Sequence, residues 1–202
     1  MKNYYRVMQG QRSIYAKEAR EGNFIAVGFI KDTDLSQRLL DNFRDFNKEF
    51  VPVFLEQNPD KTKIAAGLSC GMLWTVTKGI RVGDTVLCPD GIGNYYVGEI
   101  TGEYEYRQGA VLPHRRSVRW LSRTISRSDI SESFKNSLGS IGTVVDVSRY
   151  EKEIETLITG GHPSTAITTD AAIENPSEFV LEKHLEDFLV QNWAVTELGN
   201  RF

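Results

Sequence analysis

The chain has 202 residues and a formal net charge of −3, with ten Phe, eight Tyr and three Trp. No run approaches the ~18 apolar residues of a membrane span, and the first residues lack the apolar core of a signal peptide. Its two cysteines offer neither a disulfide framework nor a metal-ligand spacing. These features exclude membrane-spanning and disulfide-rich classes and predict a soluble, reduced, cytoplasmic protein.

The charge is divided unevenly along the chain. Residues 151–202 hold ten acidic and three basic residues, a net charge of −7, whereas residues 1–150 carry +4. Such asymmetry indicates two units with different roles, although surface charge also varies between segments of one domain. We expect a domain over residues 1–158, a linker rich in Gly, Pro, Thr, Ser and Ala over residues 159–175, and a helical unit over residues 176–202.

Secondary structure follows from side-chain pattern and turn residues. Short runs of β-branched and aromatic residues bounded by Gly predict strands, and apolar residues four apart predict helices. In chain order, the expected elements are strands at Tyr4–Met8 and Phe24–Phe29, helices around Leu35–Phe46 and from Asn58, strands at Asp84–Pro89, Tyr95–Thr101 and Ser117–Ser126, a helix at Asp129–Leu138, a strand at Thr143–Val147 and a helix opened by Ser148.

Two local expectations concern the middle of the chain. In the helix that begins at Asn58, a buried stripe is expected at positions four apart: Ile64, Leu68, Met72 and Val76. The segment Gly102–Arg116 has no clear period and is expected to be a long loop.

The sequence offers no catalytic constellation. It contains no Gly-x-Ser-x-Gly motif, and none of its three His residues has a nucleophile near it in sequence. No carboxylate pair and no acid-and-lysine pattern of a metal-dependent nuclease stands out. We therefore predict no catalytic residue, no metal site and no cofactor within this chain.

Arginines and aromatic residues interleave in one segment. Between Tyr106 and Arg127 there are six Arg, one His and neither Asp nor Glu. A local cationic and aromatic surface is what a module needs to hold a nucleic-acid backbone and stack a base. The alternative is a solvated basic loop.

Three sequence pieces follow one another in a known order. A helix bearing Trp74 precedes Gly83-Asp84, then comes Tyr96-Val97-Gly98-Glu99-Ile100, and last Val118-Arg119-Trp120-Leu121. This order resembles the PUA-like superfamily, in particular its EVE and YTH branches. The resemblance implies an α+β fold, a twisted β-barrel with flanking helices, that takes a modified base, flipped from its strand, into an aromatic cage.

The same resemblance suggests site residues. It implies a cage of Trp74, Tyr104 and Tyr106, with Phe29 as a further wall; YTH domains have a Trp pair where this chain has the two tyrosines. Tyr104 and Tyr106 share one strand parity, so their rings should lie on one face. Ser69 and Asn94 are candidates for reading the base edge, although both are more often capping or turn residues. The candidates for contact with the nucleic-acid backbone are Arg107, Arg115, Arg116, Arg123 and Arg127.

The last part of the chain carries a second resemblance. Residues 178–193 look like the opening helix of NucS/Mrr-like nuclease domains of the PD-(D/E)XK class. This implies the specificity domain of a modification-dependent restriction endonuclease, whose catalytic residues and Mg²⁺ would lie beyond Phe202. The expected ligand is DNA carrying methylated or hydroxymethylated cytosine or N6-methyladenine. The alternatives are an RNA-binding module, or a protein-interaction domain that uses the last helix, through which a homodimer could also form.

Overall fold

The computed structural model describes residues 2–161 and has an α+β fold built on one six-stranded mixed sheet. Short 3₁₀ turns cover Gln11–Ser13, Arg127–Asp129 and Ser148–Tyr150, and a π-helical turn covers Thr75–Gly79. The elements are β1 (Tyr4–Val7), α1 (Ala16–Glu21), β2 (Phe24–Val27), α2 (Phe43–Gln57), α3 (Lys63–Trp74), β3 (Thr85–Pro89), β4 (Asn94–Tyr106), β5 (His114–Ser126), α4 (Glu132–Leu138), β6 (Val144–Asp146) and α5 (Glu151–Thr159).

The sheet is open rather than closed into the expected barrel. Its strand order is β2-β5-β4-β3-β1-β6. Among the pairs of adjacent strands in this sheet, only β1 and β3 run parallel. The two edge strands, β2 and β6, form no backbone ladder with each other within residues 2–161. Instead, Gln9, which follows β1, accepts a hydrogen bond from the N–H of Ala26 in β2 at 2.9 Å. A side chain thus meets the edge of β2 where a barrel would need another strand.

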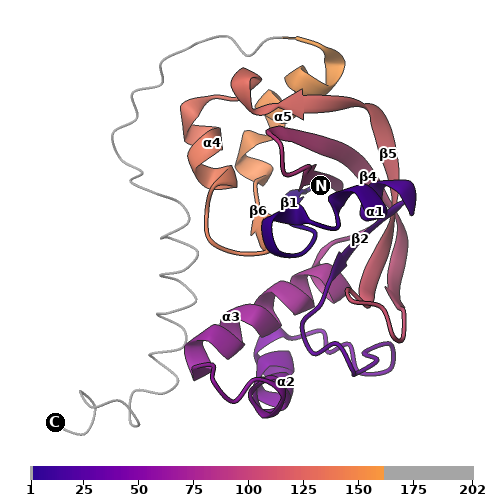
Figure 1. The fold of residues 1–202 in the computed structure, drawn as a ribbon, viewed down its shortest axis with the longest axis vertical. Coiled ribbons are helices and arrows are strands. Elements are labelled where there is room, and N and C mark those ends of the chain that lie inside the picture. Colours follow the sequence, from indigo (N-terminus) through magenta and orange to yellow (C-terminus); the bar gives the residue numbers. More distant parts are fainter. Residues whose placement is uncertain (1, 162–202) are drawn as a thin grey trace, which may run out of the picture.

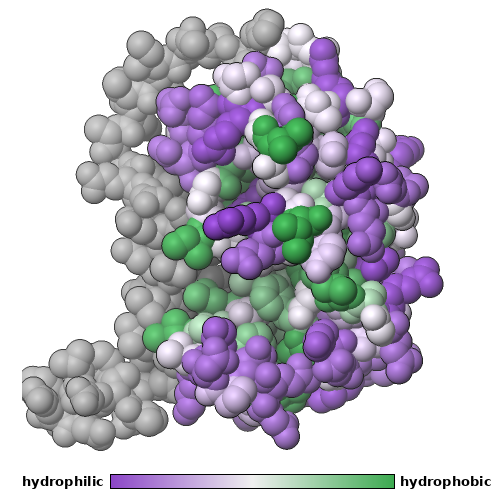
Figure 2. All heavy atoms as spheres, viewed as in Figure 1, coloured by the Kyte–Doolittle hydropathy of each residue, from purple (hydrophilic) through white to green (hydrophobic). Residues whose placement is uncertain are grey.

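Helices cover both faces of the sheet (Figure 1). α2 and α3 lie together at one end of the molecule and bury one face against a core that contains Phe46, Phe50 and Leu73. α4 and α5 lie at the other end and bury the second face around Phe134 and Ile154. Figure 2 shows a largely hydrophilic exterior, with apolar side chains gathered over the middle of the face in view. Because successive side chains of a strand point to opposite faces, β1 contributes to both cores: Tyr4 packs in the core around Phe134, and Tyr5 and Val7 pack in the other.

The two central helices differ from their predicted bounds. The stretch around Leu35–Phe46 is not helical until Phe43, because Asn42 is the N-cap: its side chain accepts the N–H of Arg44 at 2.8 Å. α3 begins after Thr62, whose hydroxyl accepts the N–H of Ala65 at 3.2 Å, rather than at Asn58. Capping side chains therefore fix both starts.

The predicted buried stripe of α3 is wrong at its first position and only half-buried at Leu68 and Met72, so that of the four residues Val76 alone is buried. Ile64 is 46% exposed, and the residues buried along the helix are Ala66, Cys70 and Leu73. α3 packs closely on α2, so small residues face its neighbour and larger ones lie at the margin. Cys70 is thus a buried free thiol, as is Cys88 in β3.

The segment Gly102–Arg116 is a hairpin and not the expected loop. β4 continues to Tyr106 and β5 starts at His114, with Tyr106 and His114 facing each other across the strands. The register shifts between Ile100 and Tyr104, which marks a β-bulge. A bulge interrupts the period-2 alternation on which strand prediction depends, and this is why the segment looked irregular.

The three sequence pieces that carry the PUA-like resemblance have structural roles in this chain. Asp84 accepts the N–H of Asn3 at 2.9 Å and that of Arg81 at 2.8 Å, so it fastens the start of β1 to the turn before β3. Gly98 lies opposite Trp120, and a Cβ at Gly98 would come within 2.7 Å of the Trp120 ring. Gly98 is therefore required for close packing of β4 against that ring.

Arg6 is a buried cation that lacks a carboxylate partner. Its side chain is fully buried, Nη2 donates to the carbonyl of Ser140 at 3.0 Å, and Nε and Nη1 have no partner within residues 2–161. Burial lowers the pKa of Arg6 to about 10, because it disfavours the charged form. The guanidinium therefore lowers the stability of the fold.

Replacement of Arg6 by Met should raise the free energy of unfolding by about 1–3 kcal/mol, since an apolar chain of similar length removes an unsatisfied buried charge. Urea denaturation of the full chain measures this. The matched control is Arg119→Met on β5, where the side chain is 67% exposed and a change within about 0.5 kcal/mol is expected. A stability loss in Arg6→Met would mean that the guanidinium is fully solvated or bonded in solution.

The last helix of the described residues, α5, ends at Thr159. The linker beyond residue 161 and the helix expected within residues 176–202 lie outside the described residues.

Candidate functional site

A long segment without regular structure, residues 28–42, connects β2 to α2; we call it loop 28–42. Polar atoms of four side chains hold its backbone. Tyr106 Oη donates to Lys31 O at 2.8 Å, the N–H of Leu35 donates to Tyr104 Oη at 3.3 Å, Trp74 Nε1 donates to Leu40 O at 3.0 Å, and His114 Nε2 donates to Ile30 O at 3.3 Å. Three of the four predicted cage aromatics thus anchor one loop.

His114 links this loop to the hairpin through a defined tautomer. It is fully buried, with Nε2 against the carbonyl of Ile30 and Nδ1 2.9 Å from the hydroxyl of Tyr104. A carbonyl can only accept, so Nε2 carries the proton and Nδ1 accepts from Tyr104. Burial lowers the pKa of His114 and so favours this neutral form. The rings of Tyr104 and Tyr106 lie 5.9 and 5.5 Å from the His114 ring, on the shared face predicted from their spacing.

Ile30 has an unusual backbone for a β-branched residue. Its φ is +48°, in the left-handed region, and its side chain is 2% exposed in the core. Such a conformation costs about 1–3 kcal/mol and persists only where its surroundings hold it. The carbonyl of Ile30 accepts from both His114 and the N–H of Thr33. The anchoring network therefore holds loop 28–42 in a strained shape.

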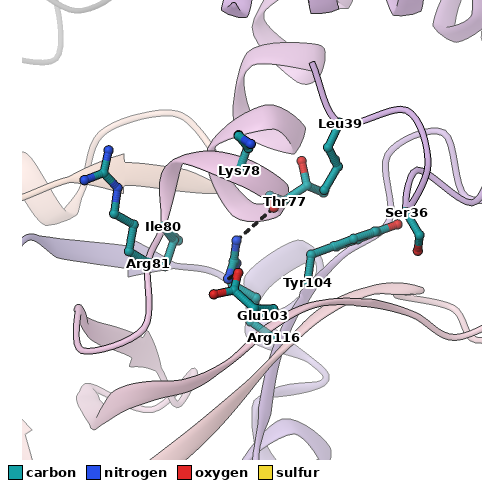
Figure 3. Close-up of a pocket in the computed structure, with 9 residues that line it drawn as sticks. All are labelled: Ser36, Leu39, Thr77, Lys78, Ile80, Arg81, Glu103, Tyr104 and Arg116. Carbon is teal, nitrogen blue, oxygen red and sulfur yellow. Dashed lines mark hydrogen bonds and ion pairs between the residues drawn. The ribbon is translucent and has the colours of Figure 1, made fainter. Parts of the chain in front are cut away.

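A cavity of about 260 Å³ opens between loop 28–42, the π-helical turn and the β4–β5 hairpin. Figure 3 shows the Tyr104 ring extending toward the part of the loop that carries Ser36, with the head groups of Arg116 and Glu103 below Thr77. The residues that line it are Ser36, Leu39, Thr77, Lys78, Ile80, Arg81, Glu103, Tyr104 and Arg116.

Arg116 forms the floor of this cavity and is only 2% exposed. Its Nε donates to Val76 O at 2.6 Å and its Nη2 to Thr77 O at 2.8 Å. Its Nη1 donates to Gly102 O at 3.2 Å and lies 3.3 Å from Glu103 Oε2. Burial lowers the pKa of Arg116, and the carboxylate of Glu103 opposes that shift. The planar guanidinium thereby joins the π-helical turn to both hairpin strands.

Two cations and one carboxylate at this cavity were missed by the sequence reasoning. Lys78 and Arg81 are exposed; Lys78 lies 2.6 Å from Asp41, whereas Arg81 forms no ion pair with any residue in the range 2–161. Glu103 has a side chain that is 83% exposed. Lys78 and Arg81 lie just before Gly83-Asp84 in the sequence, and this position is the signal that could have identified them.

Of the four predicted cage residues, Tyr104 lines the cavity and the other three do not. Trp74 donates its indole N–H to Leu40 O, and its ring packs edge-on against Phe43 with 5.7 Å between the ring centroids. Tyr106 reaches Lys31 farther along the hairpin, and Phe29 is half-buried against the core of α2 and α3. The structure therefore gathers these aromatics around loop 28–42 rather than around an open cage.

The two base-edge candidates also lie off the cavity. Ser69 is half-buried within α3. Asn94 serves the β3–β4 turn, where its N–H and its amide both donate to the carboxylate of Asp90 at 2.9 Å. Asn94 therefore has the turn role that was its alternative, whereas Ser69 lies in the interior of the helix.

The predicted arginine track does not form one surface. Arg115 stacks on Phe24, with 3.9 Å between its guanidinium carbon and the ring centroid, and Arg116 is buried in the cavity floor. Arg123 donates to Ile158 O at 3.5 Å, and Arg127 donates to Tyr95 Oη at 3.0 Å. Only Arg107 lies near the tip of the hairpin, where its side chain is 60% exposed.

Carboxylates that lie outside residues 106–127 form ion pairs with four of the six arginines of this segment. The pairs join β5 or the hairpin tip to acids on β4 and α1: Arg107–Glu105 at 2.7 Å, Arg115–Glu18 at 4.0 Å, Arg116–Glu103 at 3.3 Å and Arg119–Glu99 at 3.0 Å. The segment has no acid of its own, but its neighbouring strand supplies three.

The sequence from Tyr5 to Ser148 matches the model of a family described as a domain of unknown function, DUF8426. The chain belongs to this family. The match spans every residue that lines the cavity. A comparison with curated proteins gave no match.

Two further findings bound the chemistry of the DUF8426 domain. No helix within residues 2–161 is long and apolar enough to cross a membrane. In the same range, no three His, Cys, Asp or Glu side chains are grouped so that they could hold a metal ion. The cavity can hold a flat ligand by ring contact and by hydrogen bonds to a fixed guanidinium and a carboxylate.

Proposed function

We propose that this DUF8426 domain is a PUA-like, EVE-related module that binds a single modified base of DNA in the cavity beside Tyr104. The observation that carries the proposal is one set of groups that line the same open cavity of about 260 Å³: an aromatic ring, a buried arginine and a carboxylate. A flat heterocycle needs a ring to stack on and polar groups at its edge, and base–aromatic stacking contributes about 1–3 kcal/mol per base.

The order of the three motif pieces supports the same assignment. Trp74 ends α3, Asp84 fastens the turn before β3, and Gly98 packs on Trp120. The cavity lies between loop 28–42, the turn after α3 and the β4–β5 hairpin, and Tyr104 is the predicted cage residue that lines it. The open sheet differs from the barrel of that superfamily, so the support comes from the local arrangement of motifs.

A flipped base brings its sugar and phosphates to the rim of the pocket that receives it. Lys78 and Arg81 are the exposed cations on this rim. Because Arg81 has no ion-pair partner within residues 2–161, it is the group most able to contact a phosphate. The proposal thus moves the backbone contacts from the β5 arginines to the turn before β3.

In a full-length context, such a module would act as the specificity domain of a modification-dependent restriction endonuclease. This part of the proposal rests on the NucS/Mrr-like resemblance of residues 178–193, which lie outside the described residues. Mg²⁺ would be needed only by a nuclease domain.

Fluorescence-polarisation binding tests the proposal. One DNA sequence would carry cytosine, 5-methylcytosine, 5-hydroxymethylcytosine or N6-methyladenine, each at two salt concentrations. Preference for one modified base, with affinity that falls as salt rises, is the expected result. Equal binding to all four DNAs would contradict base recognition. Tighter binding to a matched RNA would favour an RNA-binding module, and salt-independent association with protein would favour an interaction domain.

Replacement of Arg81 by Gln should weaken binding to all four DNAs alike. Loss of one phosphate contact lowers the slope of log K against log salt by about 0.9. Arg119→Gln, on an exposed residue of β5 that does not line the cavity, should leave the slope unchanged. Equal slopes for wild type and Arg81→Gln would remove Arg81 from the interface.

A further inference from the structure

Glu103 occupies a position that stability alone does not explain. Of the four carboxylates that pair with the arginines of the hairpin, it is the one that lines the cavity. Arg116 already donates to three backbone carbonyls, and Glu103 is 83% exposed. An ion pair with one partner in solvent contributes little to folding. The carboxylate is therefore free to serve a ligand.

The hydrogen bonds of this pair leave one acceptor beside one donor. A guanidinium has five N–H groups, and four of those on Arg116 have partners: three carbonyls and Glu103 Oε2. The remaining N–H is on Nη2. Glu103 Oε1 accepts no hydrogen bond from residues 2–161. The two head groups that carry these positions lie together beside the cavity, with 3.3 Å between Arg116 Nη1 and Glu103 Oε2 (Figure 3).

Bases differ in what they present to such a pair. Cytosine and adenine carry an exocyclic amine beside an unprotonated ring nitrogen, that is, a donor beside an acceptor. Thymine and hypoxanthine have the same ring shapes but carry an oxo group beside a ring N–H. A carboxylate accepts from the amine of cytosine, but its oxygen repels an oxo oxygen in the same position.

We propose that Glu103 determines specificity for an amino-bearing base, with its Oε1 accepting from the exocyclic amine while Arg116 donates to the adjacent ring nitrogen. The proposal rests on the proposed function, because it assigns the edge contacts of the same cavity. It replaces Ser69 and Asn94 as the readers of the base.

The sharpest comparison is between 5-methylcytosine and thymine. Both carry the 5-methyl group and attach to the sugar in the same way, so they differ only at the edge that Glu103 would face. Single-stranded oligonucleotides of one sequence remove differences in base pairing. A second pair, adenine and hypoxanthine, makes the same exchange of amine for oxo on a purine. The pair with the larger preference identifies the ring class.

The wild-type chain should bind one amino base roughly tenfold to hundredfold more tightly than its oxo counterpart, the range of one good pair of base-edge contacts. Glu103→Gln should reduce this ratio to about threefold or less, because an amide can either accept from an amine or donate to an oxo group. Glu105→Gln is the matched control: an exposed carboxylate two residues away on β4 that does not line the cavity. It should keep the wild-type ratio.

The outcomes separate the two proposals. If wild type binds 5-methylcytosine and the other modified bases no better than unmodified ones, the proposed function fails. If wild type prefers a modified base but binds amino and oxo partners equally, or if Glu103→Gln keeps the wild-type ratio, the role of Glu103 is overturned while the proposed function stands. Because the side chain is exposed, both Gln variants should melt at the wild-type temperature, which excludes unfolding as the cause.

Discussion

Replacement of Arg116 by Met should lower the free energy of unfolding by about 3–5 kcal/mol, the largest effect we expect from one substitution in this domain. Its guanidinium donates to three backbone carbonyls at once: Val76 O, Thr77 O and Gly102 O. Methionine fills the space but leaves these carbonyls without partners. Chemical denaturation of the full chain measures the loss.

The neighbouring residue provides the control for Arg116. Arg115 is half-buried, lies over the ring of Phe24 and donates to one carbonyl, that of Leu112, at 3.0 Å. Arg115→Met should lower stability by about 1 kcal/mol, the typical effect of a single substitution. Arg116→Lys should fall between the two, because a point charge cannot replace a planar fork. Equal losses at residues 115 and 116 would contradict a central role for Arg116.

The arginine-rich segment shows what a linear sequence can and cannot indicate. Within 106–127 the absence of acid is real, and it predicts a cationic surface if the segment stands alone. In the fold, Glu99, Glu103 and Glu105 of β4 lie across from the arginines of β5 and the hairpin tip. The charge of a strand depends on the strand beside it, and the pairing register was hidden by the bulge between Ile100 and Tyr104.

Prediction succeeded where a pattern is local. The strands β1, β2 and β3, the turn at Asp90–Asn94 and α4 all lie close to their expected places, because period-2 apolar runs and Gly-containing turns act over a few residues. It failed where tertiary contacts decide. Nothing local marks Ala66 or Cys70 as buried, since their burial follows from the approach of α2.

The candidate site was half-predicted for the same reason. The aromatic residues Trp74, Tyr104 and Tyr106 each form a hydrogen bond with the backbone of loop 28–42, at Leu40, Leu35 and Lys31, and the irregular path of that loop has no sequence signal. Leu39 and Ser36 enter the cavity only because that loop is held there. A resemblance can name the aromatics, whereas the wall that they support depends on the whole fold.

The loop makes the stability of this domain depend on the charge of His114. Its folded pKa is lowered by burial from an ordinary value of 6.5. Below pH 6.5 the unfolded chain therefore binds more protons than the folded one, and stability falls as pH falls toward the folded pKa. Above pH 6.5 both states are neutral and the stabilisation is fully present. The expected loss is about 1.4 kcal/mol per pH unit within that window.

Denaturation of the full chain at pH 7.5 and 5.5 measures this dependence. His114→Gln keeps a donor for the carbonyl of Ile30 but cannot titrate, so it should be less stable at pH 7.5 and lose less of its stability on acidification. Protonation of His114 also removes the acceptor of the Tyr104 hydroxyl, so the N–H of Leu35, which donates to that hydroxyl, should be less protected from hydrogen exchange at pH 5.5 than at pH 7.5 in wild type, once each rate is divided by the intrinsic exchange rate at that pH. If wild type and His114→Gln lose equal stability between the two pH values, another group carries the acid response, and the strained Ile30 is held by packing rather than by the neutral imidazole.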